Sequence, residues 1–231
     1  MWYDEFGIMT QEQVSMTRNA YQILLEGASA EIVEKKSRFI ATIRPVKTEE
    51  EASAFIEKMK KQYWDARHNC SAFVVGENNC ITRCSDDGEP SGTAGRPMLE
   101  VLLGSGITNI AVVVTRYFGG VLLGTGGLVR AYQGAVQEAL PLCKTGIMLT
   151  GTYYQITASY ADAGKIQNVA AEENIDVLDT EYGENVRFRM FLTTEEESRI
   201  LAQITDRTAG RATMREESKG TFLKQKPGDI H

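Results

Sequence analysis

The feature that most constrains the fold of this chain is a change of pattern near residue 142. Before it, apolar residues recur at helical spacing until Pro141, which cannot continue a helix. These residues are Leu128, Ala131, Tyr132, Ala135, Val136, Ala139 and Leu140. After the stretch "LCKTGIMLTG", a new series of strands and helices begins. We therefore expect an N-terminal extension (1–20), a first domain (21–142), a second domain (151–219) and a tail (220–231).

The first domain has a mixed pattern of strands and helices. A strand-like alternation ends at Pro45, and Thr48 with Glu51 forms a capping box before an apolar series at helical spacing. The stretch "CSAFVVGENNCITRC" predicts a hairpin, and "IAVVV" predicts a buried strand. Between them we expect a short helix with Pro97 near its first turn and Gly104 past its end.

The second domain follows a different order. "YYQITASY" predicts a strand, and an apolar series after it predicts a helix that ends around Asn174. "IDVLDTEYGENVRFRMFLTT" is typical of a hairpin that turns on Tyr-Gly-Glu-Asn. Thr194 with Glu197 forms a second capping box before another helix, and a last strand follows from Ala212. This β-α-β-β-α-β order is the ferredoxin-like motif, so the whole chain is expected to be α+β.

Charge and composition exclude several classes of protein. The net charge of −6 and the sequence pI near 5.2 argue against a protein that coats nucleic acid through its total charge. The longest apolar run, Ile110–Val114, is far shorter than the roughly 20 residues of a membrane helix, so no membrane contact is expected. Sparse cysteines and an N-terminus without a signal-peptide pattern are typical of a cytoplasmic protein.

A local basic surface remains open despite the acidic total. Most such charges form a solvated face. If basic groups on the first strands share a surface with those on the first helix, they would provide a contact for RNA or the ribosome. The candidates are Lys35, Lys36, Arg38 and Arg44 on the strands, and Lys58, Lys60 and Lys61 on the helix.

The stretch Ser85–Pro97, "SDDGEPSGTAGRP", is an acidic loop with two interpretations. Asp86, Asp87 and Glu89 carry carboxylates that suit a hard cation such as Mg²⁺. Aspartate and glycine are also ordinary turn residues, and the spacing lacks the pattern of a calcium loop, so metal binding is the weaker interpretation. Thr93 is the hydroxyl flanked by small residues, but it lacks the sequence context of a serine hydrolase.

A second possible metal site combines histidine and cysteine. The spacing of its members departs from standard zinc patterns, although a hairpin could gather the side chains. Cys70 stands beside the apolar "SAFVV", which favours a small core residue over a ligand or a nucleophile paired with His68. We therefore expect a buried, reduced Cys70, no bound metal and no cofactor. The four residues concerned are His68, Cys70, Cys80 and Cys84.

The glycine-rich stretch "TRYFGGVLLGTGGLVRAY" also has two interpretations. Free N–H groups at the start of the helix that it enters would bind an anion, with Arg116 and Arg130 adding charge. The dinucleotide pattern fails at Val129, and no lysine follows the glycines as it does in a P-loop. The alternative, slightly favoured for Gly124 and Gly126, is a tight turn packed close to a sheet. The glycines concerned are Gly124, Gly126 and Gly127.

Three stretches together resemble the YigZ/Impact family. They are "KKSRFIATIRPVKTEEEASAFIEKMKKQYWDARHNCSAFVVG", "DDGEPSGTAGRPMLEVL" and "VVVTRYFGGVLLGTGGLVRAY". The likeness runs from about Glu31 to Leu140, and the segment from Arg116 to Gly120 matches the signature of the family. The C-terminal part is similar to the small domain that follows in bacterial YigZ-type members.

The resemblance implies a two-domain α+β protein. Its first domain would be a two-layer α/β sandwich similar to domain IV of elongation factor G. Its second would be a ferredoxin-like domain similar to domain V of that factor. Eukaryotic Impact proteins restrain the amino-acid-starvation kinase by competing for its activator, and they use an extra N-terminal domain that this sequence lacks. A proline-dipeptide hydrolase role has been attached to some bacterial members.

Residues and resemblance together predict a non-enzymatic, translation-linked binding protein whose partner is RNA, the ribosome or a translation-associated protein. The acidic loop and the glycine-rich turn would form opposite walls of one polar surface, with at least one carboxylate paired to an arginine. The alternatives are a metal-assisted, peptidase-like hydrolase that uses the acidic loop, and a pure protein-interaction module. The candidate binding residues are His68, Asp86, Asp87, Glu89, Thr93, Arg116, Tyr117, Gly126, Gly127, Arg130 and Tyr132.

Overall fold

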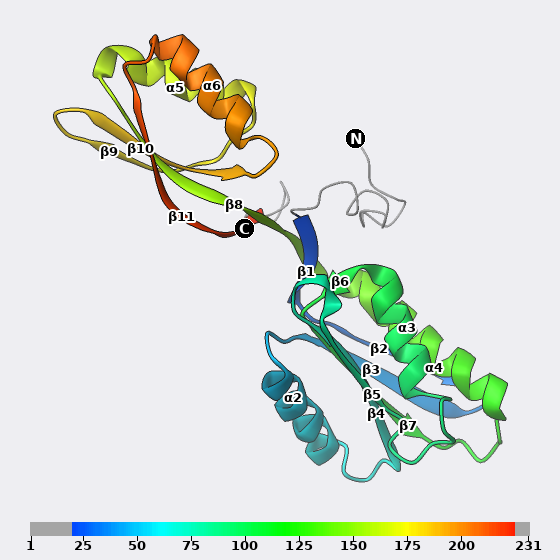
Figure 1. Cartoon of the computed structure of the whole chain (residues 1–231). Helices are drawn as coiled ribbons and strands as arrows, with labels where there is room; N and C mark the ends of the chain where they lie inside the picture. The colour runs from blue at the N-terminus through cyan, green and yellow to red at the C-terminus, as the bar shows by residue number, and fades with distance from the viewer. Residues whose placement is uncertain (1–19, 225–231) are drawn as a thin grey trace. The chain divides into compact units, whose positions relative to one another are not determined.

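A computed structural model of the chain describes residues 20–224, and Figure 1 shows its helices and strands. The described residues divide into two compact units, with the division between Ile147 and Met148. Nearly all of the expected N-terminal extension lies outside the described residues, as does the end of the expected tail. None of the described helices is long and apolar enough to cross a membrane.

The first unit is built on a five-stranded sheet in which all neighbouring strands run antiparallel. Outside this sheet, β1 (Ala20–Glu26) pairs in parallel with the short strand β6 (Ile107–Thr108). In sheet order the five strands are β2 (Ser29–Glu34), β3 (Ser37–Pro45), β7 (Ile110–Tyr117), β4 (His68–Val75) and β5 (Ile81–Ser85).

Helices cover both faces of this sheet (Figure 1). On one face α3 (Gly95–Ser105) and α4 (Thr125–Ala139) pack against inward side chains such as Phe39 and Val112. On the other face α2 (Glu49–Gln62) packs on a smaller apolar cluster that includes Phe73. Successive residues of a strand point to opposite sides, so the central strands β7 and β4 supply both clusters. The layer of α3 and α4 forms the sandwich that the resemblance implies, and α2 covers the opposite face.

Two helix ends in this unit differ from prediction. α3 continues through Gly104 because Gly106, with a φ of 70°, is the residue that adopts the left-handed conformation and ends the helix. α4 begins at Thr125, three residues earlier than the first residue of its apolar series, Leu128. The capping box is placed correctly, since Thr48 accepts a hydrogen bond from the backbone of α2.

The second unit has the β-α-β-β-α-β order that the sequence predicts (Figure 1). The sheet order is β11-β8-β10-β9, with the first and third strands in the centre, which is the ferredoxin-like arrangement. The two helices and the sheet share one apolar core. In chain order the elements are β8 (Lys144–Ala158), α5 (Tyr160–Glu172), β9 (Val177–Tyr182), β10 (Val186–Thr193), α6 (Glu197–Thr208) and β11 (Thr213–Lys224).

The structure differs from the expected boundaries of the second unit in three places. Most of the stretch expected to link two domains is the beginning of β8, and β11 continues past residue 219. The predicted capping box of Thr194 and Glu197 is absent, because α6 begins at Glu197. The Glu197 carboxylate instead accepts hydrogen bonds from the hydroxyls of Thr152 (3.0 Å) and Tyr154 (2.8 Å) on β8.

Candidate functional site

Asp86 organises the acidic loop that connects β5 to α3. Its Oδ1 accepts hydrogen bonds from the backbone N–H groups of Ala94 (3.0 Å) and Gly95 (2.8 Å), and its Oδ2 accepts one from Gly92 (2.8 Å). Burial alone would raise the pKa of this carboxyl, but the three backbone hydrogen bonds hold the pKa below its usual value. Asp86 therefore closes the loop over the first turn of α3, and neither carboxylate oxygen is directed at an external ligand.

We expect Asp86→Asn to destabilise the first unit by about 2 kcal/mol at neutral pH, because hydrogen bonds to a charged acceptor contribute about 1.5–3 kcal/mol. The asparagine NH₂ group would also face a backbone donor. Folding lowers the pKa of Asp86. The carboxylate therefore makes its full contribution to the free energy of unfolding above the unfolded-state pKa, and this contribution is lost as the pH falls through the folded-state pKa. Urea unfolding of both proteins between pH 7 and pH 2 should show the difference shrinking with acid. A difference independent of pH would contradict this assignment.

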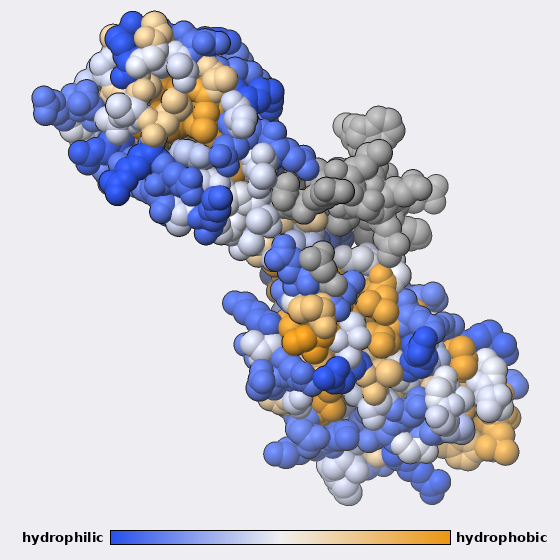
Figure 2. Space-filling model, in the orientation of Figure 1, coloured by the Kyte–Doolittle hydropathy of each residue, from blue (hydrophilic) through white to orange (hydrophobic). Residues whose placement is uncertain are grey.

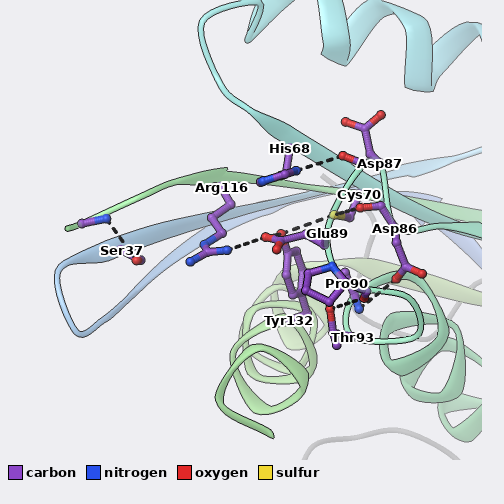
Figure 3. A network of polar contacts seen from close by, with 12 residues as sticks. Ser37, His68, Cys70, Asp86, Asp87, Glu89, Pro90, Thr93, Arg116 and Tyr132 are labelled. Atoms are coloured by element: carbon purple, nitrogen blue, oxygen red, sulfur yellow. Dashed lines mark hydrogen bonds and ion pairs between the residues drawn. The ribbon is translucent and has the colours of Figure 1, made fainter. Parts of the chain in front are cut away.

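Glu89, Arg116 and Tyr132 form a buried polar network on the α4 side of the sheet (Figure 3). Arg116 Nη1 lies 2.6 Å from Glu89 Oε1, and the Tyr132 hydroxyl donates to the same oxygen at 2.8 Å. The Arg116 guanidinium also lies over the ring of Phe39, which packs edge-on against Tyr132. The network thus connects the acidic loop, the end of β7 and α4.

The prediction that an acidic residue pairs with an arginine is confirmed by this ion pair. The prediction that the pair lies on an open polar surface is wrong, because the Arg116 and Glu89 side chains are only 8% and 3% exposed. Arginine and glutamate are each expected on the surface when considered singly, but the two opposite charges can be buried together because they neutralise each other. An external anion at Arg116 would have to displace Glu89 inside the unit, so the structure does not support Arg116 as part of an anion site.

Arg130 and the glycines of α4 lie apart from this network. Arg130 is exposed on α4, whereas Arg116 is buried, so the two arginines do not face one open surface. Gly126 and Gly127 lie in the first turn of α4, where no side chain caps the helix. A Cβ at Gly127 would lie 3.0 Å from Leu123 Cβ, so this glycine permits close packing of the preceding loop.

Asp87 has a second set of contacts, in which its carboxylate reaches α2 and its carbonyl oxygen contacts His68. The carboxylate of Asp87 accepts a hydrogen bond from Asn69 N (2.7 Å) and forms an ion pair with Lys60 (3.0 Å). His68 Nδ1 lies 2.9 Å from the carbonyl oxygen of Asp87. Tyr117, at the end of β7, donates to Asp65 Oδ1 at 2.8 Å. These side chains are thus held by neighbours within the unit.

The sequence candidates for metal binding are not gathered in the structure. Among the described residues, no three histidine, cysteine, aspartate or glutamate side chains are arranged to hold a metal ion. Cys80 and Cys84 are exposed, whereas Cys70 is buried, as the sequence predicts. Thr93 is also buried, and its hydroxyl donates to the Pro90 carbonyl at 2.6 Å.

Cys70 has the properties of a core thiol rather than of a nucleophile. Its Sγ lies 3.3 Å from the Tyr132 hydroxyl and 3.0 Å from the Asp86 carbonyl oxygen. Burial raises the pKa of the Cys70 thiol to about 12, so the reactive thiolate is scarce at neutral pH. Burial likewise raises the pKa of Tyr132. A Cys70–His68 catalytic pair therefore has no support in this geometry.

An apolar loop tip lies beside the buried network, and the sequence interpretation missed it. The β7–α4 loop (residues 118–124) exposes Phe118, Val121 and Leu122, of which Leu122 is 83% exposed. Figure 2 shows apolar surface at the edge of the first unit where this loop lies. The available signal was the run "FGGVLLG", in which large apolar residues occur inside a glycine-rich turn.

Contacts with Lys36, Ser37 and Arg116 hold the β7–α4 loop in place. Gly119 N donates to Ser37 Oγ at 3.1 Å, and a Cβ at Gly119 would lie only 2.0 Å from the Lys36 backbone, so only glycine fits. The Arg116 guanidinium lies 5.7 Å from the centre of the Phe118 ring. The buried network therefore supports the exposed tip at its first residue.

Comparisons with known proteins agree with the two units. Residues 35–140 match the Impact N-terminal domain, and residues 156–211 match the Domain of unknown function (DUF1949). IMPACT family member YvyE of Bacillus subtilis is 43% identical over 207 residues, which cover 90% of this chain and 95% of that protein. IMPACT family member YigZ of Escherichia coli is 38% identical over 81% of this chain and 94% of its own length.

More distant and structural matches are consistent with these. Protein IMPACT of Mus musculus is 32% identical over 98 residues, which cover 40% of this chain and 30% of the mouse protein. A solved structure described as "Crystal structure of an hypothetical protein" is 35% identical, with a TM-score of 0.56 over 85% of this chain and 96% of that chain. The matches to YvyE and YigZ extend over almost the full length of those proteins, and the chain therefore belongs to the IMPACT family.

Proposed function

We propose that the protein is a non-enzymatic, translation-linked binding protein that contacts a ribosomal or translation-associated protein through the β7–α4 loop. The observation that carries this proposal is the exposed apolar tip of the loop, with Leu122 83% exposed next to exposed Val121 and Phe118. Large apolar side chains grouped on a surface are typical of protein contacts. The loop is therefore the surface of the first unit best suited to a protein partner.

The support beneath the loop favours binding. A loop that already holds its bound conformation loses less conformational entropy when a partner binds. Gly119 is fixed against the Lys36 backbone, and Phe118 lies over the buried Arg116. The Arg116–Glu89 pair and Tyr132 thus act as a brace for the loop rather than as groups that touch the partner.

The link to translation rests on the family. The resemblance of both domains to domains of elongation factor G, and the role of eukaryotic Impact proteins in controlling translation, support a partner on or near the ribosome. The acidic loop gives the alternative, a metal-assisted hydrolase, less support than the exposed loop tip gives to a binding protein. Its carboxylates bind backbone N–H groups, a buried arginine or a lysine within the unit.

Co-sedimentation with purified bacterial ribosomes tests the loop. We expect the intact chain to co-sediment and Leu122→Asp to reduce its affinity by about tenfold or more, the effect of losing one apolar contact residue. Leu142→Asp is the matched control, because Leu142 is also exposed (62%) and lies outside the loop. It should bind like the unchanged protein. Equal affinities for the two variants, or no co-sedimentation of the intact chain, would contradict the proposal.

A further inference from the structure

A groove separates α2 from the strands β2 and β3 on the face of the sheet opposite α3 and α4. Its volume is about 430 Å³, which is within the range of about 300–1,000 Å³ that is common for ligand sites. Ser29, Thr42 and Arg44 line it from the strands, and Phe55, Lys58 and Tyr63 line it from α2 and the residue that ends α2. The groove lies on a different face from the buried network around Arg116.

The charge of this groove is opposite to that of the whole protein. Among the described residues that line it, Arg44 and Lys58 are the charged ones and none is acidic, although the chain has a net charge of −6. Both side chains belong to exposed residues, and within residues 20–224 neither forms an ion pair. Arg44 Nη1 donates to the Ile43 carbonyl (3.0 Å), which helps to position the guanidinium at the groove. Two cations without a carboxylate nearby favour an anionic ligand.

Aromatic and further basic residues continue from the end of α2. Phe55 and Tyr63 are half-buried in the groove, and Trp64, the next residue, is 82% exposed. A tryptophan this exposed is unusual in a folded protein and is typical of a contact surface. Lys61 and Arg67, on either side of this segment, are exposed as well.

We propose that this groove binds single-stranded RNA, with backbone phosphates at Arg44 and Lys58 and bases stacked on Tyr63 and Trp64. Basic residues that follow the backbone, together with aromatic rings for the bases, are the usual means of binding a nucleic acid strand. Because Lys61 and Arg67 extend the basic surface beyond the groove, a strand of several nucleotides fits better than a free nucleotide. The hydroxyls of Ser29 and Thr42, 3.4 Å apart in the groove, can bond a ribose 2′-OH. The choice of RNA over DNA also rests on the translation-linked function proposed above, whereas the binding surface is a separate one.

Fluorescence titration with a twelve-nucleotide oligouridylate tests the groove. Trp2 and Trp64 are the two tryptophans of the chain, so Trp64 is the single reporter in a Trp2→Phe background. We expect RNA to quench Trp64, and Arg44→Gln and Lys58→Gln each to weaken binding by about fivefold or more, with a smaller dependence on salt concentration. The matched control is Lys219→Gln, which removes an exposed lysine of β11. This variant should bind RNA with an affinity within about twofold of the unchanged protein, because Lys219 contacts no phosphate in the proposed complex.

The other outcomes separate the alternatives. If Arg44→Gln and Lys58→Gln bind RNA as Lys219→Gln does, the groove is not the RNA site. If an equal concentration of uridine monophosphate displaces the oligouridylate completely, the groove binds a mononucleotide and the proposal of a strand is wrong. If the oligodeoxyuridylate of the same length binds with equal affinity, the choice of RNA over DNA is wrong. Ribosome co-sedimentation of the groove variants is measured separately. Leu122→Asp changes the β7–α4 loop and retains both groove cations, so the two sets of variants test different surfaces. Failure of one proposal therefore leaves the other testable.

Discussion

Arg116→Ala is expected to destabilise the first unit by about 3–5 kcal/mol, the cost of leaving a buried charge without its partner. Glu89 would lose the guanidinium 2.6 Å away while remaining almost fully buried. Phe39 and Phe118 would also lose the guanidinium that lies over their rings. Urea unfolding followed by circular dichroism would report this loss.

A matched control and a double variant make this prediction specific. Arg38→Ala removes an arginine whose pair with Glu31 (2.8 Å) is exposed to solvent, so it should cost less than about 1 kcal/mol. The double variant Glu89→Leu/Arg116→Met should be more stable than Arg116→Ala, because it leaves no unpaired buried charge. A loss below about 1 kcal/mol for Arg116→Ala would show that the pair is not a structural brace.

This expectation changes how Arg116 is used in functional experiments. If Arg116 lay on an open polar surface, as the sequence predicts, its variants would weaken partner binding with little loss of stability. Because the structure buries Arg116 beneath the β7–α4 loop, any binding defect of Arg116→Ala would reflect a loosened loop. Leu122, which is exposed, is the residue that separates binding from stability.

A fragment of residues 148–224 is expected to fold alone and to unfold cooperatively, because the second unit has its own apolar core. A fragment ending at residue 219 should be less stable by about 2–4 kcal/mol, since it loses a packed aromatic side chain. Phe222 lies 5.3 Å from the Phe191 ring, and the Tyr153 hydroxyl donates to the Thr221 carbonyl at 2.8 Å. Thermal unfolding followed by circular dichroism compares the two fragments.

The variant Phe222→Ala in the longer fragment is the control for truncation. It removes the aromatic contact with Phe191 but retains the backbone of β11, so it should reproduce most of the loss. If both fragments unfold at the same temperature, the last five residues of β11 do not stabilise the unit. If the longer fragment shows no cooperative transition, the second unit is not an independent domain.

The sequence predicted the local elements because their signals act over a few residues. The run "IAVVV" is the buried strand β7, Thr48 caps α2, and the β-α-β-β-α-β order of the second unit is present. Helix ends were less predictable. Gly104 and Gly106 are both glycines near the end of α3, and only the conformation shows that Gly106 ends it.

Burial and assembly of the site depended on tertiary structure. Sequence and resemblance selected Glu89, Arg116 and Tyr132, but charge alone predicted a solvent-facing surface for the first two. The structure buries the pair, because a close partner replaces the hydration that each charge loses. The exposed tip at Leu122 was missed because apolar residues in a sequence predict a core, and only the folded chain shows which of them lack neighbours.

The sequence by itself determined the α+β class, the order of the elements in the second unit, the family and the buried Cys70, because periodicity and motifs are properties of consecutive residues. Only the tertiary structure decided which distant residues meet. Arg44 on β3 and Lys58 on α2 were candidates for a shared basic surface, and their meeting in one groove depends on where α2 packs on the sheet. That position is set by the apolar contacts of α2 with residues such as Phe73, which are far apart in the chain and which no local pattern encodes.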